Sequence, residues 1–234
     1  MTDNVDAEEL KRFDAIAARW WDPQGEMGAL HAINPLRTRY IEQCAGGLQA
    51  KAVVDVGCGA GILSEALAAR GARVLGIDLA QEVLAAARRH LAQTKLPVEY
   101  REIAAEDLAA ERPGAFDLVT CLEMLEHVPD PAAVVAACAK LARPGASVVF
   151  STINRNPKAY ALAIVAAEYL LNLVARGTHE YAKLIRPSEL DRWARAAGLE
   201  VLEIRGMTYN PLLKSARLSD DCDVNYLMHC RRPA

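Results

Sequence analysis

Short, β-branched apolar segments alternate with helical segments through the middle of this 234-residue chain, and this alternation constrains its fold most strongly. Most of the helical segments are followed by a glycine or a proline, which ends them. Strands are expected at residues 52–56, 73–78, 98–103, 116–121 and 147–152. Strands and helices that alternate at this spacing form right-handed βαβ units, with parallel strands in one sheet and helices on both of its faces. The chain is therefore predicted to have an α/β fold with a mostly parallel sheet.

Two helices are expected before the first strand. Residues 8–21 carry apolar side chains at helical spacing. A second helix is expected from Pro35 to Cys44, with Asn34 as its cap and proline at its first position. Residues 1–50 would then form an N-terminal helical cap.

The pattern changes after the fifth predicted strand. Residues 154–186 interrupt the alternation and indicate an insertion. Residues 199–205 and 223–230 are expected to be strands that form an antiparallel pair at the sheet edge, which makes seven strands in total. All of these segments are assigned to a single domain, residues 1–234.

Composition limits the classes of protein to consider. Hydrophobic residues make up 52% of the chain, enough for a large buried core. The formal net charge of −3 argues against a general nucleic-acid binder, which needs a basic excess. The N-terminus has no apolar signal region, and the longest apolar run, residues 159–175, falls short of the ~20 residues that span a bilayer. A cytoplasmic protein is expected.

A glycine-rich turn follows the first predicted strand and opens a helix. Gly57, Gly59 and Gly61 let the backbone approach a ligand closely, and free amides at the start of the helix would point towards it. Asp78 ends the next strand, about 20 residues later, where a carboxylate can bind both hydroxyls of a ribose. The alternative for Asp78 is an ordinary helix cap.

The details of the turn favour one nucleoside ligand. Enzymes that bind NAD carry a further glycine or alanine where this chain has Ile62. Asp55 precedes the first glycine, where it would repel a pyrophosphate but suit an ammonium group. S-adenosylmethionine has a ribose, an ammonium and a sulfonium but no phosphate, so it is the expected cosubstrate. Glu106 and Asp107 are candidates to bind its adenine amino group, with a solvated charged loop as the alternative.

At this point the chain resembles a known family. The segments that resemble class I S-adenosylmethionine-dependent methyltransferases are DVGCGAG at 55–61, GID at 76–78, FDLVTCLEMLEHVPDP at 116–131 and STINRNPKAY at 151–160. With HAINPLRTRYI at 31–41 and DVNYLMHC at 223–230, the chain is more closely similar to the ubiquinone-biosynthesis O-methyltransferases. The resemblance implies a Rossmann-like fold and O-methylation of polyprenylated phenols of the 2-polyprenyl-6-hydroxyphenol and 3-demethylubiquinol types.

The resemblance also implies contacts to the cosubstrate. They are Arg37, Gly57, Asp78 and Leu122, and Arg37 would reach the methionine carboxylate, which a guanidinium can bind with two hydrogen bonds. Without the resemblance, Arg37 would be taken for an arginine on a helix surface. Ala60 is a departure, because the family often has another glycine there.

Three polar residues, Glu123, Glu126 and His127, cluster after the fourth strand, where parallel sheets bind ligands. A phenol has a pKa of about 10, so the enzyme must remove its proton or stabilise the phenolate. One interpretation is that the three residues bind magnesium or manganese, and the resemblance implies magnesium at such a Glu-x-x-Glu-His motif. The second is that His127 acts alone as a general base. The third is that the three residues form a structural helix cap.

The insertion is expected to contain an apolar helix at residues 158–176, with Glu168, Asn172 and Arg176 on one stripe. Residues 155–186 contain five basic and two acidic side chains. This pattern fits a helix on an anionic membrane, with contact through residues 158–186, or a lid over the site.

The expected partners follow from the fold and the resemblance. They are a polyprenylated phenol, an anionic surface that makes the protein peripheral to the inner membrane, and an assembly with other ubiquinone-pathway enzymes. The alternatives are a methyltransferase of another small phenol or acid, and a non-catalytic scaffold with the same fold. A scaffold need not retain Asp55, Gly57, Gly59 and Asp78, so it is disfavoured.

Overall fold

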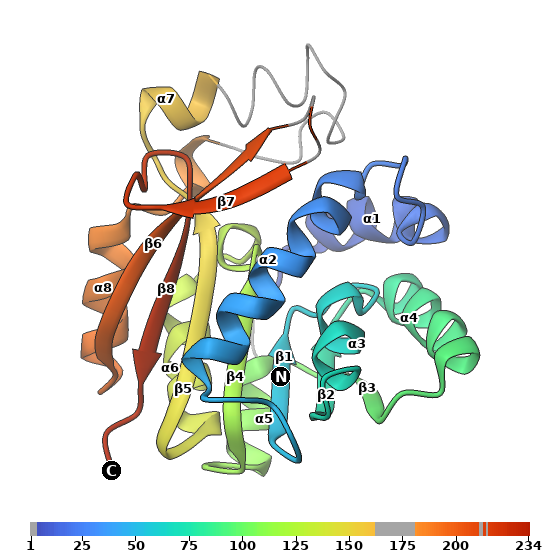
Figure 1. The fold of residues 1–234 in the computed structure, drawn as a ribbon, viewed down its shortest axis with the longest axis horizontal. Helices are drawn as coiled ribbons and strands as arrows, with labels where there is room; N and C mark the ends of the chain where they lie inside the picture. The colour runs from blue at the N-terminus through green and yellow to red at the C-terminus, as the bar shows by residue number, and fades with distance from the viewer. Residues whose placement is uncertain (1–3, 162–180, 211–212, 214) are drawn as a thin grey trace.

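The computed structural model describes residues 4–161, 181–210, 213 and 215–234. Within these residues the strands form one sheet with the order β3-β2-β1-β4-β5-β8-β6-β7 (Figure 1). The strands are β1 (Ala52–Val56), β2 (Arg73–Asp78), β3 (Val98–Glu102), β4 (Phe116–Leu122), β5 (Ala142–Ile153), β6 (Glu200–Asn210), β7 (Ser215–Ser219) and β8 (Asn225–Arg231). The strands β1 to β5 are parallel, as expected from the βαβ pattern.

Helices cover both faces of this sheet (Figure 1). They are α1 (Ala7–Ile16), α2 (Gly28–Cys44), α3 (Ile62–Ala68), α4 (Gln81–Thr94), α5 (Ala105–Glu111), α6 (Pro131–Leu141), α7 (Pro157–Ala159) and α8 (Pro187–Ala196). Side chains of α5, α6 and α8 share one core with the sheet, and those of α2 and α3 share the other. Each core takes alternate residues of a strand: Val54 and Val56 pack on the first, and Val53 on the second. A strand buried on both faces needs this continuous apolar composition.

The prediction of seven strands is wrong, because the described residues contain eight. The strand missed is β7, with the sequence SARLS, which lacks an apolar face and pairs with the end of β6. The antiparallel pairing of β6 with β8 is confirmed, but β8 lies between β5 and β6, and β7 forms the outer edge. The buried side chains of β8 explain its interior place, since Tyr226 and Met228 join one core and Leu227 the other.

The N-terminal helices also differ from the prediction. Helix α2 begins at Gly28 and continues through Pro35, and Asn34 does not cap it but donates from Nδ2 to the carbonyl of Ile62 at 3.0 Å. Buried side chains such as Ile41 hold α2 against the sheet, so packing outweighs the helix-breaking tendency of proline. The first helix is shorter than expected, because α1 ends at Ile16 and a 3₁₀ turn follows.

Most of the predicted apolar helix at 158–176 lies outside the described residues, and so does much of the insertion at 154–186. The described parts of the insertion are residues 154–161, which include α7, and residues 181–186. Among the described residues, no helix is both long enough and apolar enough to span a bilayer.

Candidate active site

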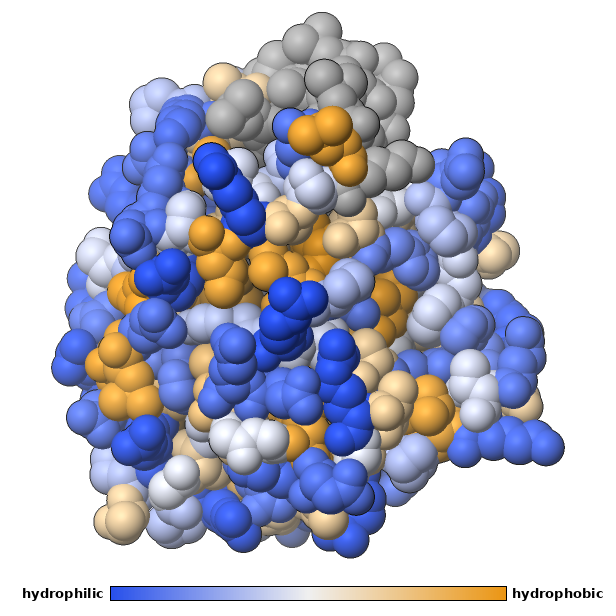
Figure 2. Space-filling model, in the orientation of Figure 1, coloured by the Kyte–Doolittle hydropathy of each residue, from blue (hydrophilic) through white to orange (hydrophobic). Residues whose placement is uncertain are grey.

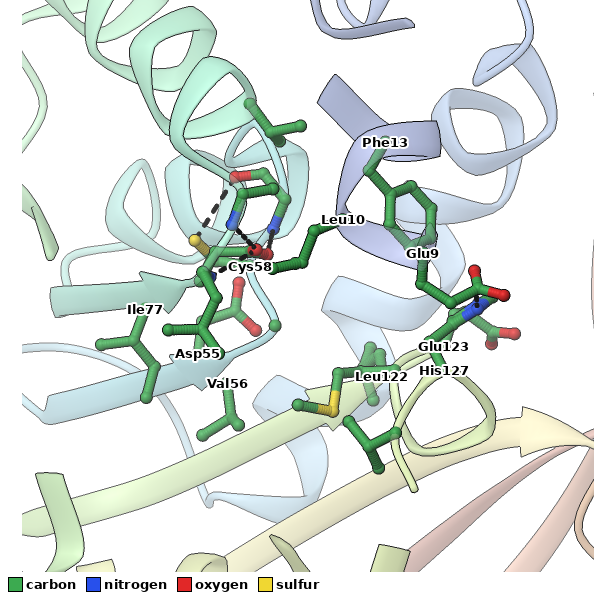
Figure 3. Close-up of a pocket in the computed structure, with 18 of the residues that line it drawn as sticks. Glu9, Leu10, Phe13, Asp55, Val56, Cys58, Ile77, Leu122, Glu123 and His127 are labelled. Atoms are coloured by element: carbon green, nitrogen blue, oxygen red, sulfur yellow. Dashed lines mark hydrogen bonds and ion pairs between the residues drawn. The ribbon is translucent and has the colours of Figure 1, made fainter. Parts of the chain in front are cut away.

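A cavity of about 290 Å³ lies where strands β1, β2 and β4 end, and helix α1 lines its opposite wall (Figure 3). Open parallel sheets bind ligands at this edge, and the volume is near the lower end for small-molecule sites. Most of the predicted site residues line the cavity: Arg37, Asp55, Gly57, Gly59, Asp78, Glu106, Leu122, Glu123 and His127. Two predicted residues, Asp107 and Glu126, are not among the lining residues.

The glycine turn forms the floor of the cavity, and glycine is required there by both conformation and space. Gly57 and Gly59 have positive φ angles of 67° and 54°. A Cβ on Gly57 would overlap the side chain of Met124, and one on Gly59 would lie 2.7 Å from the ring of Trp20. An L-residue at either position would therefore be strained and would displace a neighbour.

The amides of this turn bond within the protein. The amide of Cys58 donates to the carbonyl of Ile77, that of Gly59 to Asp78, and that of Gly61 to the carbonyl of Cys58. The expectation that free amides face the ligand is wrong for these three. The turn instead presents its close-approaching backbone and the carboxylates beside it.

Asp78 holds this turn while it lines the cavity. Its Oδ2 accepts from Gly59 N at 2.9 Å, and its Oδ1 accepts from the amides of Leu79 and Ala80 at 2.7 and 2.9 Å. A carboxylate has about four lone-pair sites, so about one remains for a ribose hydroxyl. Burial raises the pKa of Asp78, although these three hydrogen bonds favour the charged form.

Arg37 and Asp55 form a buried pair of opposite charges on the α2 side of the cavity. Asp55 is 2% exposed and accepts from Ser64 Oγ at 2.6 Å and from Thr120 Oγ1 at 2.7 Å. Burial raises its pKa, which these two hydroxyls counteract. Arg37 is 4% exposed, so the alternative of a surface arginine is wrong.

Arg37 also has an unsatisfied donor. Its Nη2 donates to Asn34 Oδ1 at 3.3 Å, but its Nε finds no hydrogen-bond partner among the described residues. Burial lowers the pKa of this guanidinium, so a negative ligand would stabilise it. The donor set therefore fits the amino-acid end of S-adenosylmethionine, with the carboxylate on Arg37 and the ammonium on Asp55.

Glu106 and Asp107 lie in the first turn of α5, a helix that the sequence pattern did not predict, and not in a loop. Acidic residues are favourable at this end of a helix. Glu106 lines the cavity and accepts from Asn4 Nδ2 at 2.8 Å. The structure thus brings Glu106, but not Asp107, to the place expected for the adenine.

Glu123 occupies a strained position where β4 ends. Its φ of 52° is rare for a residue other than glycine, and strain of this kind collects at functional sites. Its Oε1 accepts from Ser151 Oγ at 2.6 Å and from Asn225 Nδ2 at 3.1 Å. These bonds hold the carboxylate at the cavity wall.

Glu126 and His127 point to other partners. Glu126 is 2% exposed, and its Oε2 accepts from Thr152 Oγ1 at 2.8 Å. His127 Nδ1 lies 3.2 Å from Glu9 Oε2, and its ring meets Phe13 edge-on at 5.0 Å. No cluster of three His, Cys, Asp or Glu side chains able to hold a metal ion forms within the described parts of the chain. The predicted magnesium ligands are therefore not assembled in this arrangement.

The cap interpretation of these residues is also wrong. The next helix, α6, has Asp130 as its N-cap, and Asp130 accepts from the amide of Ala133 at 3.2 Å. Of the three interpretations, the geometry favours His127 as the base, because its ring lines the cavity and a carboxylate orients it.

Helix α1 supplies lining residues that the site prediction missed. They are Glu9, Leu10 and Phe13, with Asp6 just before the helix. The helical spacing of Leu10 and Phe13 indicated an apolar face that must pack on something. Nothing local in the sequence indicated that it covers this cavity, or that Glu9 is buried with 5% exposure.

Comparisons with known proteins agree with this geometry. Residues 29–204 match a family model described as a methyltransferase domain. The chain is 57% identical to the "Ubiquinone biosynthesis O-methyltransferase" of Pseudomonas paraeruginosa, with 99% of both chains covered. It is 59% identical to the protein of that name from Thiobacillus denitrificans, again with 99% of both covered.

Among solved structures, the fold is similar to magnesium protoporphyrin IX methyltransferase from Synechocystis PCC 6803 with bound S-adenosylhomocysteine (SAH). The TM-score is 0.68 at 17% identity, with 96% of this chain and 93% of that chain covered, which supports the fold. Sequence, fold and site agree: the chain belongs to the ubiquinone biosynthesis O-methyltransferase family and is an S-adenosylmethionine-dependent methyltransferase with the class I Rossmann-like fold.

Proposed function

We propose that this enzyme transfers the methyl group of S-adenosylmethionine to a phenolic oxygen of polyprenylated intermediates in ubiquinone biosynthesis. The substrates would be of the 2-polyprenyl-6-hydroxyphenol and 3-demethylubiquinol types. The observation that carries the proposal is a single cavity with two chemically distinct walls (Figure 3). Asp55 and the glycine turn lie on one wall, and His127, Glu123 and Glu9 lie on the other. Full-length relatives with this named activity support it.

The first wall would bind and orient the cosubstrate. Arg37 would take the methionine carboxylate, Asp55 the ammonium, and Asp78 a ribose hydroxyl, while Glu106 would receive the adenine amino group. Leu122, 7% exposed at the end of β4, would pack against the bound molecule. Fixing both reactants in one site removes much of the entropic barrier to their reaction.

The second wall would activate the substrate. A phenol with a pKa of about 10 is mostly neutral at pH 7, and its oxygen is then a weak nucleophile. His127 would accept the phenolic proton as the oxygen attacks the methyl carbon. The O–CH₃ bond forms, the S–CH₃ bond breaks, and its electron pair neutralises the sulfonium to give SAH.

The neighbouring carboxylates would assist this step. Glu123 faces the cavity and would accept a hydrogen bond from a second substrate hydroxyl. Glu126 is buried behind the ring, where its negative charge favours protonated His127. Burial lowers the pKa of His127, but Glu9, Glu126 and Glu123 outweigh it and raise the pKa above the ordinary value.

We further propose contact with an anionic membrane through residues 158–186, which would place the enzyme peripheral to the inner membrane and near a lipid-tailed substrate. The basic excess in this region supports the proposal. So do the exposed rings of Tyr160 and Tyr181, which pack edge-on at 5.5 Å. Figure 2 shows apolar side chains gathered around the β6–β7 hairpin and the adjacent end of α2. Assembly with other ubiquinone-pathway enzymes remains a proposal of the same kind.

The decisive experiment is methyl transfer from labelled S-adenosylmethionine to a short-chain prenyl catechol, with the product identified by mass spectrometry. A soluble catechol without a prenyl tail serves as the comparison. Faster turnover of the prenylated compound supports the proposal, and methylation of the soluble compound alone would assign the enzyme to another substrate class. A parallel series with magnesium and with a chelator tests whether Glu123 and Glu126 leave their present partners to bind an ion.

A further inference from the structure

We infer that Glu9, on the N-terminal helix, is a positioning residue for His127: it accepts a hydrogen bond from Nδ1–H and so fixes the ring that acts as the base. The inference rests on the proposed function, in which His127 removes the phenolic proton. It adds a residue from a helix that lies outside the βαβ core and outside every motif that indicated the function.

The contact between the two residues is buried and joins distant parts of the chain. Glu9 Oε2 lies 3.2 Å from His127 Nδ1, across 118 residues of sequence. The side chains are 6% and 11% exposed, so solvent screens the pair weakly. A buried carboxylate needs a reason to be there, because burying an unpaired charge is costly.

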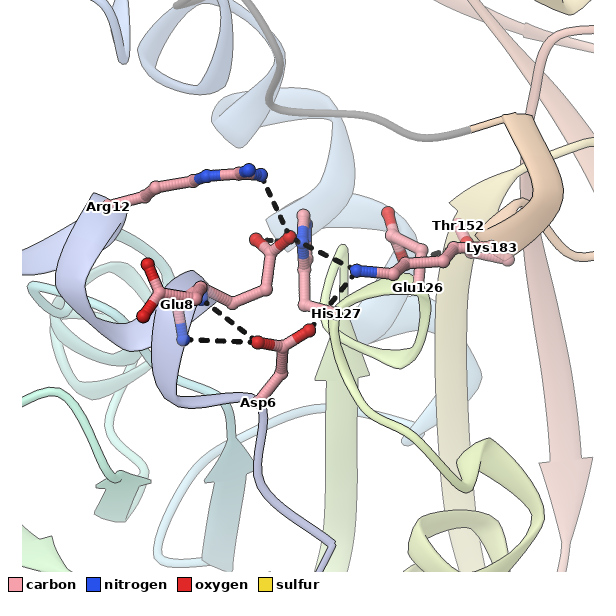
Figure 4. A network of polar contacts seen from close by, with 8 residues as sticks. Asp6, Glu8, Arg12, Glu126, His127, Thr152 and Lys183 are labelled. Carbon is pink, nitrogen blue, oxygen red and sulfur yellow. Dashed lines mark hydrogen bonds and ion pairs between the residues drawn. The ribbon is translucent and has the colours of Figure 1, made fainter.

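The Glu9 carboxylate is itself held in place (Figure 4). Its Oε1 lies 3.2 Å from Arg12 Nη1 and 3.4 Å from Lys183 Nζ. Lys183 also donates to Asp6 Oδ2 at 3.2 Å, which fastens the start of α1. Two cations therefore engage one carboxylate oxygen, and the other oxygen is directed at His127.

The same helix fixes the plane of the ring. Phe13, one helical turn after Glu9, meets the imidazole edge-on, with an angle of 83° between the ring planes. A carboxylate on Nδ1 and an aromatic ring beside it leave the imidazole little freedom to rotate. Helix α1 thus supplies both contacts that set the orientation of His127.

This geometry has a chemical consequence. A neutral imidazole whose Nδ1–H donates to a carboxylate carries its lone pair on Nε2, so the base would act through Nε2. When the ring takes up the phenolic proton, the adjacent carboxylate stabilises the imidazolium. Serine hydrolases use a carboxylate in the same way to hold a histidine base.

The test compares Glu9→Gln with Glu8→Gln in the full-length enzyme. Glutamine keeps the size of Glu9 but removes its charge and allows its amide to donate, which favours the wrong tautomer of His127. Glu8 is the matched control, because it is the adjacent residue on α1, is exposed and pairs with exposed Lys11. We expect kcat for the prenyl catechol to fall about 10- to 100-fold in Glu9→Gln, with KM for S-adenosylmethionine within twofold of the wild-type value.

A spectroscopic measurement makes the test independent of turnover. The ¹⁵N shifts of the His127 imidazole, assigned by their loss in His127→Gln, report which nitrogen carries the proton. We expect the Nδ1–H form in the wild type and in Glu8→Gln, and a changed form in Glu9→Gln. Unchanged shifts together with an unchanged kcat in Glu9→Gln would overturn the inference while leaving the proposed function intact. Wild-type enzyme that methylates no prenyl catechol would remove the proposed function, and the ¹⁵N shifts would still show whether Glu9 sets the tautomer.

Discussion

The carboxylate of Asp78 accepts hydrogen bonds from three backbone amides while it faces the cavity. The sequence placed Asp78 at the end of a strand, and either ribose binding or a helix cap would explain it there. In the structure, Ala80 is the N-cap of α4, and Asp78 links β2 to the glycine turn. One residue therefore both shapes the turn and presents an acceptor to the ligand.

Asp78→Asn is expected to weaken SAH binding about 10- to 100-fold, since a hydrogen bond to a charged group contributes about 1.5–3 kcal/mol. Asparagine keeps one carbonyl oxygen for the backbone amides, so the fold should persist. Titration calorimetry measures the affinity, and circular dichroism checks the fold. Equal affinity in a folded variant would contradict the assignment of Asp78 to the ribose.

Gly57→Ala is expected to destabilise the protein more than Gly145→Ala. Both glycines have positive φ, 67° and 79°, so alanine is strained at either position, by about 1–2 kcal/mol. Only at Gly57 would the new methyl group also overlap a side chain, that of Met124, whereas nothing lies within 4 Å at Gly145. Urea denaturation of the two variants measures the difference, and equal losses of stability would show that Met124 moves aside without cost.

Strand β8 shows how an element can be predicted correctly and its place in the sheet missed. Its apolar residues indicated a strand, and its pairing with β6 was expected. Insertion between β5 and β6 depends on both faces of β8 being covered, which only the assembled layers decide. Helix α1 is a second example: its apolar spacing predicted a helix, but the cavity that it lines is formed by the strand ends.

The burial of His229 on β8 predicts how stability depends on pH. Its side chain is nearly buried, with Nε2 3.1 Å from Ser147 Oγ, and burial, aided by Arg231, lowers its pKa. Because the folded state resists protonation, the stabilising contribution of neutral His229 is complete above the unfolded pKa of about 6.5. It is lost as the pH falls through that value towards the lower folded pKa.

His229→Gln keeps a partner for Ser147 and removes this titration. The free energy of unfolding, measured by urea denaturation between pH 7.5 and pH 5, should therefore decrease less in the variant than in the wild type. An equal or steeper decrease would show that His229 titrates with its ordinary pKa in the folded protein.

For the whole molecule, the cavity joins parts of the chain that are far apart in sequence. Its lining includes residues before the first strand, residues at the ends of β1, β2 and β4, and Ile153 at the end of β5. A ligand that bridges these parts should stabilise the entire fold, because it binds only when they are assembled.

At 100 times its Kd, SAH is expected to add about 2.7 kcal/mol to the free energy of unfolding. For a chain of this size, that corresponds to a rise in Tm of about 5–11 °C. Thermal unfolding with and without SAH measures the shift, and Asp78→Asn at the same ligand concentration should show a smaller one. A shift of equal size with NADH would contradict the argument drawn from the glycine turn.

The sequence by itself determined the βαβ core, the glycine turn and the carboxylates at the strand ends. These features depend on local periodicity and on short spacings, so each leaves a readable pattern. It also placed Arg37, Asp55 and Asp78 correctly at the cavity, although only the structure showed Arg37 to be buried with an unsatisfied Nε.

Only the tertiary structure decided which distant residues meet. Glu9 reaches His127 across 118 residues, and Asn225 reaches Glu123 across 102. The local sequence carries no signal for either pair, because each depends on how helices and strands pack once the chain has folded. The same packing directs Glu123, Glu126 and His127 to separate partners, although their spacing in the sequence suggested one shared site for a metal ion.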